Sequence, residues 1–292
     1  MKIFGGQAVI EGVMMKSPGY WTVAVRDQKG EVHLKAEKLK KLPGFLRLPL
    51  VRGVVGLYQA LSIGIKAIEF SASKAYNEEE KPANPVVMGS TIVFAVLMGI
   101  GLFIFLPLYL TKLMGMFLSG VSRSSFIFNL VDGIIRVLIF LAYVSAIGLW
   151  KDMRRIFEYH GAEHKAIHAY EAGRDLDVEN VKSFSPQHPR CGTSFLLIVM
   201  IISILTFSFI PQTWPFYAKF LSRLVLIPLI AGVSYELLKF SAKAKDNPAV
   251  NLLVLPGLLL QRLTTREPDD SQIEVAIRAL REAVNLEEGN AG

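Results

Sequence analysis

The sequence predicts an α-helical polytopic membrane protein with about four transmembrane helices and a small cytoplasmic α+β portion. Hydrophobic residues make up 52% of its 292 residues and charged residues only 20%, compared with about 25% charged residues in soluble domains. One run of 25 residues carries no charge, which is enough helix to cross a hydrocarbon layer of about 30 Å. Lys and Arg cluster between the apolar runs, as they do in cytoplasmic loops.

Residues 1–47 are expected to form a cytoplasmic β-rich segment. Strand-like composition extends over Gln7 to Met15, Tyr20 to Arg26 and Glu31 to Glu37. The last two runs flank residues 27–30, Asp-Gln-Lys-Gly, which are typical of a hairpin turn. We therefore expect a small antiparallel sheet.

The segment 48–85 is apolar but interrupted. Leu48 to Phe70 contains Arg52, Lys66 and Glu69 together with three glycines. This pattern is typical of an interfacial or re-entrant amphipathic helix, here followed by a linker.

Residues 86–149 are expected to contain the first two transmembrane helices. Val86 to Leu110 lacks charged residues, and Phe126 to Leu149 carries only Asp132 and Arg136. These two residues are four apart and so share a helix face. Because an unpaired charge inside a membrane is costly, we expect them to form an ion pair within the helix bundle.

Residues 195–238 are expected to contain the third and fourth transmembrane helices. Phe195 to Ile210 is an apolar run that ends at a proline, and Phe216 to Tyr235 is the next. The second of these runs begins with Lys219 and Arg223, which we expect at the membrane interface.

The distribution of basic residues predicts the orientation of the chain. There are 13 Lys and Arg in residues 1–85, seven in 150–194 and seven in 239–292, but two in 111–125. The positive-inside rule then predicts a multi-pass protein of the cell inner (plasma) membrane with both termini in the cytoplasm.

The net charge of +7 in so hydrophobic a chain indicates contact with anionic lipids, so the lipid bilayer is the expected partner. A homo-oligomer or another membrane protein is a further candidate. No basic tract has the interleaved aromatic residues of a nucleic-acid-binding surface, so no nucleic-acid partner is expected.

Residues 239–292 are expected to be a cytoplasmic segment with an amphipathic helix. Pro248 to Leu260 is apolar but broken by a Pro-Gly pair, which favours a segment on the membrane surface or re-entering it. Ser271 and Glu274 have the spacing of a capping box. The apolar residues that follow at helical intervals are Ile273, Ile277, Leu280 and Val284. We expect this helix to cover the sheet or the 150–194 loop.

The 150–194 segment, predicted as a cytoplasmic motif loop, holds four of the five histidines. If its first part is helical, one stripe carries His160, Glu163, His164, His168 and Glu171. Histidines four apart can bind one divalent metal ion, most simply zinc. Residues 160–164 also have the H-x-x-E-H order in which the glutamate activates a water molecule. The alternative is a solvated polar helix face that contacts lipid phosphates.

A second polar cluster precedes the third apolar run. His188 and Cys191 are typical metal ligands, and the hydroxyls of Thr193 and Ser194 are placed to orient them. Because the second transmembrane helix leads into the first cluster and the third leaves from the second, both clusters are expected at the same membrane face. The alternative for Cys191 is a buried, apolar role. A single cysteine excludes an internal disulfide framework and a multi-cysteine zinc site.

Three further residues are candidates with open alternatives. Glu11 is an acid in an otherwise apolar strand, either on a solvated face or buried as a base or ligand. Arg52 opens an apolar stretch, where a phosphate-binding arginine and a snorkelling one have the same sequence signature. Arg266 lies in 264–270, a segment whose capping residues are also typical of a helix start.

Five segments in order resemble the YqhQ-type family of uncharacterised bacterial membrane proteins, described as predicted metal-dependent enzymes. They are GGQAVIEGVMMK at 5–16, Arg52-Gly53, HGAEHKAIHAYE at 160–171, HPRCGTSF at 188–195 and TTREPDDSQIEVAI at 264–277. The resemblance covers essentially the whole chain. The functional residues that it implies are Glu11, His160, Glu163, His164, His188, Arg190 and Cys191, with Arg52 and Arg266 as anion-binding supports.

Two classes of function follow. One is a metal-dependent hydrolase in which His160 and His164 bind zinc, His188 or Cys191 completes the ligand set, and Glu163 is the general base. The other is a non-enzymatic scaffold or regulatory protein in which the same clusters are structural. A small transporter is a weaker third candidate, and the sequence selects no substrate.

Overall fold

A four-stranded antiparallel sheet forms the amino-terminal part of the protein in a computed structural model that describes residues 2–40, 43–76, 85–189, 191–243 and 248–289. The strands follow one another in the order β1-β2-β3-β4. Their bounds are Gly5–Val9, Gly12–Lys16, Tyr20–Arg26 and Val32–Lys38. The small antiparallel sheet is therefore confirmed, but the single strand predicted over Gln7 to Met15 is wrong.

Two strands and a tight turn replace that single strand. Val9 of β1 is paired with Gly12 of β2, so only Ile10 and Glu11 connect them. Glu11 adopts a φ of 49°, a left-handed conformation that is uncommon outside glycine. Apolar residues continue on both sides of Glu11 and Gly12, which is why the sequence reads as one strand. Glu11 accordingly lies on a turn and not on a sheet face.

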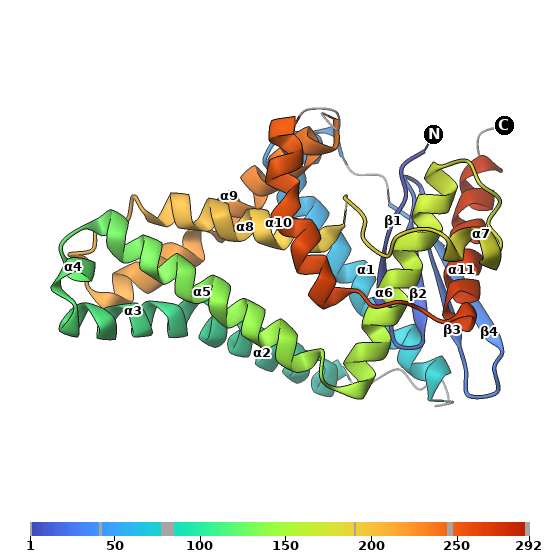
Figure 1. The fold of residues 1–292 in the computed structure, drawn as a ribbon, viewed down its shortest axis with the longest axis horizontal. Helices are drawn as coiled ribbons and strands as arrows, with labels where there is room; N and C mark the ends of the chain where they lie inside the picture. Colours follow the sequence, from blue (N-terminus) through green and yellow to red (C-terminus); the bar gives the residue numbers. More distant parts are fainter. Residues whose placement is uncertain (1, 41–42, 77–84, 190, 244–247, 290–292) are drawn as a thin grey trace.

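Helices cover both faces of the sheet (Figure 1). Val13 and Met15 of β2 point to one face, where they pack against α6 (Lys151–Glu171) and α11 (Asp270–Glu288). Met14, between them in sequence, packs on the opposite face with α1 (Val51–Ala75). The alternation of strand side chains thus produces two cores and a three-layer arrangement. The expected carboxy-terminal helix does cover the sheet.

Helix α1 joins the sheet to the rest of the molecule. Near its start, Gly53 packs against Gly232 and Tyr235 of α9 (Phe216–Lys243), and further along Ile63 and Ala67 pack on the sheet. It is continuous over 25 residues, so the glycines do not interrupt it. The interfacial placement of this segment stays a prediction, favoured by the contact of its second half with the sheet.

The remaining helices form an elongated bundle beside the sheet (Figure 1). They include a continuous helix in which a π-helical turn at Gly101–Phe105 joins α2 to α3. Among the described residues, the bundle helices are α2 (Pro85–Ile100), α3 (Leu106–Phe117), α4 (Ser119–Ser122), α5 (Ser125–Ile147), α8 (Gly192–Phe207), α9 and α10 (Pro248–Thr264). A short 3₁₀ turn at Gly44–Arg47 precedes α1.

Four helices in the described chain are long and apolar enough to cross a membrane, which confirms the predicted number. Their membership differs from the prediction. They are Val51–Ala75, Val86–Phe117, Ser125–Ile147 and Phe216–Phe240. The predicted third span corresponds to α8, whose 16 residues fall short of the ~20 needed. The fourth helix of this set is instead α1, which the sequence predicted to be interfacial or re-entrant.

A charged network lies inside the bundle. Asp132 accepts hydrogen bonds from Arg136 at 2.7 Å and from Arg223 of α9 at 2.6 Å. Both guanidinium groups also lie about 5 Å from the ring centre of Phe207, at 4.9 and 5.1 Å. The predicted pair of Asp132 and Arg136 is confirmed. The expectation that Arg223 lies at the interface is wrong, because it is fully buried and completes the network.

Two further local predictions can be compared with the structure. In the 150–194 segment, the helix considered for the first part is present as α6, and α7 (Val178–Lys182) follows it. The capping box of α11 is formed by Asp269 and Gln272 and not by Ser271 and Glu274. Asp269 accepts the backbone N–H of Gln272 at 2.9 Å, so Ser271 already lies in the first helical turn.

Candidate metal centre

Three segments that are distant in sequence meet at the side of α6 that faces the bundle. They are the middle of α6, residues 185–191, and the end of α10. The side chains of His160, His164 and Cys191 each present a ligand atom here, and these atoms lie within 4.8 Å of one another. The helical stripe predicted from the sequence therefore forms, and Cys191 joins it. The Nε2 atom of His160 lies 3.2 Å from the Cys191 Sγ atom.

Backbone carbonyl groups fix the orientation of both histidine rings. The Nδ1–H of His160 donates to the Thr264 oxygen at 2.7 Å, and that of His164 donates to the Pro186 oxygen at 2.6 Å. Because a carbonyl can only accept, each ring carries its proton on Nδ1 and has a lone pair on Nε2. The Nε2 of His164 is buried and has no hydrogen-bond partner among the described residues. Histidines that bind metals are commonly held in this way.

Glu163 lies beside the two Nε2 atoms. Its Oε2 is 3.9 Å from that of His160 and 3.7 Å from that of His164. Burial raises the pKa of Glu163 to about 8, and only partial compensation comes from His160 and the Gly6 N–H. Burial likewise lowers the pKa of His164 well below 6.5. The cluster thus combines a His164 ring that burial favours in its neutral form with an acid that ionises poorly unless a cation is near.

The other two histidines form an adjoining pair. His168 donates from Nε2 to the Gln187 oxygen at 2.8 Å, and the His188 Nε2 lies 3.5 Å from a Glu171 carboxylate oxygen. The rings of His168 and His188 are 4.5 Å apart. Neither belongs to the three-residue group of ligand atoms, so they surround the cluster predicted to bind metal and do not form its centre.

Small residues allow these segments to approach. A Cβ atom on Gly161 would lie 2.0 Å from the Arg266 oxygen, and one on Gly6 would lie 2.9 Å from the Glu163 Cγ. The backbone of His188 is held by the side-chain amide of Gln261, which donates to its oxygen and accepts from its N–H, both at 2.8 Å. Sequence reasoning missed Gln261, although an amide within an apolar helix was a usable signal.

The structure does not gather the remaining candidates at the cluster. Glu11 is held by Arg155, with two contacts of 2.5 Å, and by the Tyr159 hydroxyl. Arg52 is paired with Glu236 of α9. The backbone N–H of Arg266 donates to the Phe157 oxygen at 2.9 Å, but its side chain is exposed. Arg190 lies outside the described residues.

Comparison with known proteins gives one family and one relative. The family described as "Protein of unknown function (DUF1385)" matches residues 48–286. An "Uncharacterized protein YqhQ" of Bacillus subtilis (strain 168) is 33% identical over an alignment 300 positions long, gaps included, which covers 97% of this chain and 93% of the relative. No solved structure matches.

Proposed function

The chain belongs to the DUF1385 family of proteins of unknown function, and from the site alone we propose that it is an integral membrane protein that holds a divalent metal ion, zinc, through His160, His164 and Cys191. The observation that carries this proposal is the convergence of two ring lone pairs and a thiol within 4.8 Å. Two imidazoles and a thiolate are a ligand set that zinc favours. The Nε2 of His164, which is buried without a hydrogen-bond partner among the described residues, is available to bind a cation.

A hydrolytic activity is the finer part of the proposal. A zinc ion with three protein ligands supplies a Lewis acid and lowers the pKa of water. Glu163 is placed to accept a proton, because its Oε2 lies within 3.9 Å of the Nε2 atoms of His160 and His164, and a cation held there would favour its ionised form. The substrate class is left open among peptide, lipid and small amide.

The test is the metal content of the purified full-length protein. We expect about one zinc ion per chain in the wild type, as a single site of this kind holds, and loss of most of it in His164→Ala. His33→Ala tests the other group of residues that could hold a metal ion, Asp27, Glu31 and His33, and should leave the zinc content unchanged. A wild-type protein without metal, or full retention in His164→Ala, would contradict the proposal.

Cobalt substitution adds a test of Cys191. A thiolate ligand gives cobalt(II) an absorption band from sulfur-to-metal charge transfer, which Cys191→Ser should abolish while leaving d–d bands. If the band persists in Cys191→Ser, the thiol is not a ligand.

A purely structural role is the second candidate. It is favoured by the hydrogen bonds through which the cluster joins α6 to residues 185–191 and to α10. Glu163→Gln separates the two. If Glu163 is a catalytic base, the variant should keep its zinc content and stability but lose hydrolysis. If Glu163 belongs to a structural network, the variant should lose about 1–3 kcal/mol of unfolding free energy, because a buried hydrogen-bond partner is removed.

The inner-membrane location and cytoplasmic termini belong to the same proposal, supported by the concentration of Lys and Arg in residues 1–85, 150–194 and 239–292. A carboxy-terminal fluorescent protein should fluoresce, and a carboxy-terminal alkaline phosphatase should be inactive. The reverse pattern would mean that the carboxy terminus lies on the other side of the membrane.

A further inference from the structure

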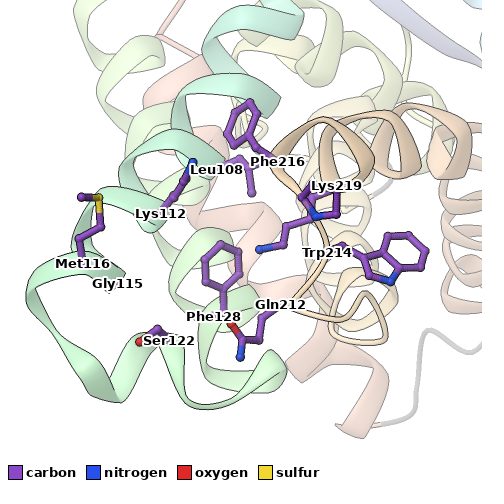
Figure 2. A pocket seen from close by; sticks show the side chains of 11 residues that line it. Leu108, Lys112, Gly115, Met116, Ser122, Phe128, Gln212, Trp214, Phe216 and Lys219 are labelled. Carbon is purple, nitrogen blue, oxygen red and sulfur yellow. The ribbon is translucent and has the colours of Figure 1, made fainter.

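A pocket of about 310 Å³ lies at the end of the bundle, where α3 and α5 meet the start of α9. Figure 2 shows that the side chains of Lys112 and Lys219 come from opposite walls, with Phe128 and Gln212 near them. At ~30 Å³ per water molecule, the space is equal to about ten waters. It is independent of the histidine cluster, none of whose residues line it.

The two lysines bring charge without a counterion. Lys219 is 9% exposed, and its Nζ lies 4.3 Å from the ring centre of Phe128. Lys112 lies 5.6 Å from the ring centre of Phe216. No carboxylate within the described parts of the chain forms an ion pair with either lysine. For Lys219, which is buried, a position beside other cations is costly unless an anion is supplied, whereas Lys112 is exposed.

The surrounding sequence offers almost no acid. Residues 86–149 and 192–235 together contain one acidic residue, Asp132, but five basic ones. Asp132 is already bound by Arg136 and Arg223. The charge of Arg223 also acts on Lys219, so the region around the pocket is electropositive and neither of these two stretches has a free acid to neutralise it.

The other walls are apolar. Met116 and Trp214 line the pocket and are 73% and 46% exposed at its edge. The pocket therefore has a cationic interior and an apolar rim on a helix bundle that lies in lipid. Neutral donors are present as well, since Gln212 and Ser122 line it.

We propose that this pocket binds the phosphate group of an anionic ligand between Lys112 and Lys219. The apolar rim and the size of the pocket fit a phospholipid headgroup whose chains leave past Met116 and Trp214. Inorganic phosphate carries the same charge and is the alternative source, although it would fill only part of the space.

The experiment measures thermal unfolding of the full-length protein in maltoside micelles, which contain no phosphate. Phosphatidylglycerol should raise the unfolding temperature by about 5 °C, as a ligand at 100 times its Kd does for a protein of this size. Diacylglycerol, which has the same chains without phosphate, should not. Inorganic phosphate alone tests the soluble source: an equal rise with it would assign the site to a free anion.

Substitutions locate the effect. Lys112→Gln and Lys219→Gln should each lose most of the rise. Arg123→Gln should keep it, since Arg123 is an exposed cation at the same end of the bundle that does not line the pocket. Lys112 is exposed, so its variant tests the proposal even if Lys219→Gln fails to fold. An equal rise with diacylglycerol, or an undiminished rise in Lys112→Gln, would overturn the proposal.

Discussion

Two buried polar clusters can be compared, and they differ in how their charges are balanced. In the bundle, the carboxylate of Asp132 lies between the guanidinium groups of Arg136 and Arg223. In the histidine cluster, the ring nitrogens of His160 and His164 and the Glu163 oxygen face one another without a cation among the described residues. Opposite charges are paired in the first cluster, whereas the second brings imidazole, thiol and carboxyl groups together without an ion pair of this kind.

This difference separates a cluster whose charges are paired within the protein from one whose role is tested by adding a metal ion. Paired opposite charges are stable without further partners, and breaking the pair is what costs free energy. Imidazole, thiol and carboxyl groups in contact need protons or a metal ion between them. The backbone carbonyls of Thr264 and Pro186 orient the rings of His160 and His164, which is the arrangement that our proposed zinc site requires. The predictions below test this distinction.

The largest effect is expected for Asp132→Ala. The substitution leaves two buried guanidinium groups without their carboxylate, which should lower the free energy of unfolding by about 3–5 kcal/mol. Denaturant unfolding in micelles measures it. Asp175→Ala, in an exposed connecting segment, should stay within about 0.5 kcal/mol of the wild type. Equal stability of the two variants would show that the bundle network is not structural.

At the histidine cluster, the free energy of unfolding should depend on added metal and not on an ion pair within the protein. Zinc at 100 times its Kd should raise the free energy of unfolding of the metal-free protein by about 2.7 kcal/mol, and a chelator should reverse the effect. His164→Ala should lose the increment and His33→Ala should retain it. A zinc effect that survives in His164→Ala would place the metal elsewhere.

The sequence predicts the composition of the histidine cluster better than its construction. The spacing of His160, Glu163 and His164 on one helix face follows from helical geometry alone, and the structure brings Cys191 to them. The carbonyls of Thr264 and Pro186 could not be predicted, because backbone groups leave no signature in the residue type. Arg223 was misplaced for a similar reason: its partner Asp132 is on another helix, and periodicity carries no information about which helices are neighbours.

The fold shows the same limit. Apolar length predicts that a helix exists, as for α5, but α8 and α1 exchange places in the set of possible spans. The sequence gives length and hydrophobicity, while the choice between membrane and sheet for α1 depends on Ile63 and Ala67 finding the sheet core. Contacts of this kind are long-range and leave no local pattern.

A glycine substitution tests how tightly the histidine cluster is assembled. In Gly161→Ala the new Cβ would lie 2.0 Å from the Arg266 oxygen, so α6 and the segment after α10 must separate. We expect a loss of about 1–3 kcal/mol in unfolding free energy. We also expect weaker zinc binding, because the displaced Arg266 is only two residues from Thr264, whose carbonyl orients His160. Gly192→Ala is the control, since open space surrounds Gly192. Unchanged zinc affinity in Gly161→Ala would show that this approach of the two segments is not required.

The smallest effect is expected at Asp269, which lies outside both clusters and calibrates ordinary surface electrostatics. Burial acts to raise the pKa of Asp269, but the hydrogen bonds from Ser271 and Gln272 outweigh it and lower the pKa below 3.8. The carboxylate is therefore favoured in the folded state, so its contribution is present above pH ~4 and is lost as the pH falls through the lowered folded-state pKa.

Asp269→Ala should cost about 1 kcal/mol at pH 7, the usual value of a helix cap. Asp269→Asn keeps the cap and removes only the charge, so its difference from the wild type should shrink on acidification, and unfolding curves between pH 7 and pH 3 measure it. A difference in unfolding free energy that is constant over this range would mean that ionisation of Asp269 contributes nothing to stability.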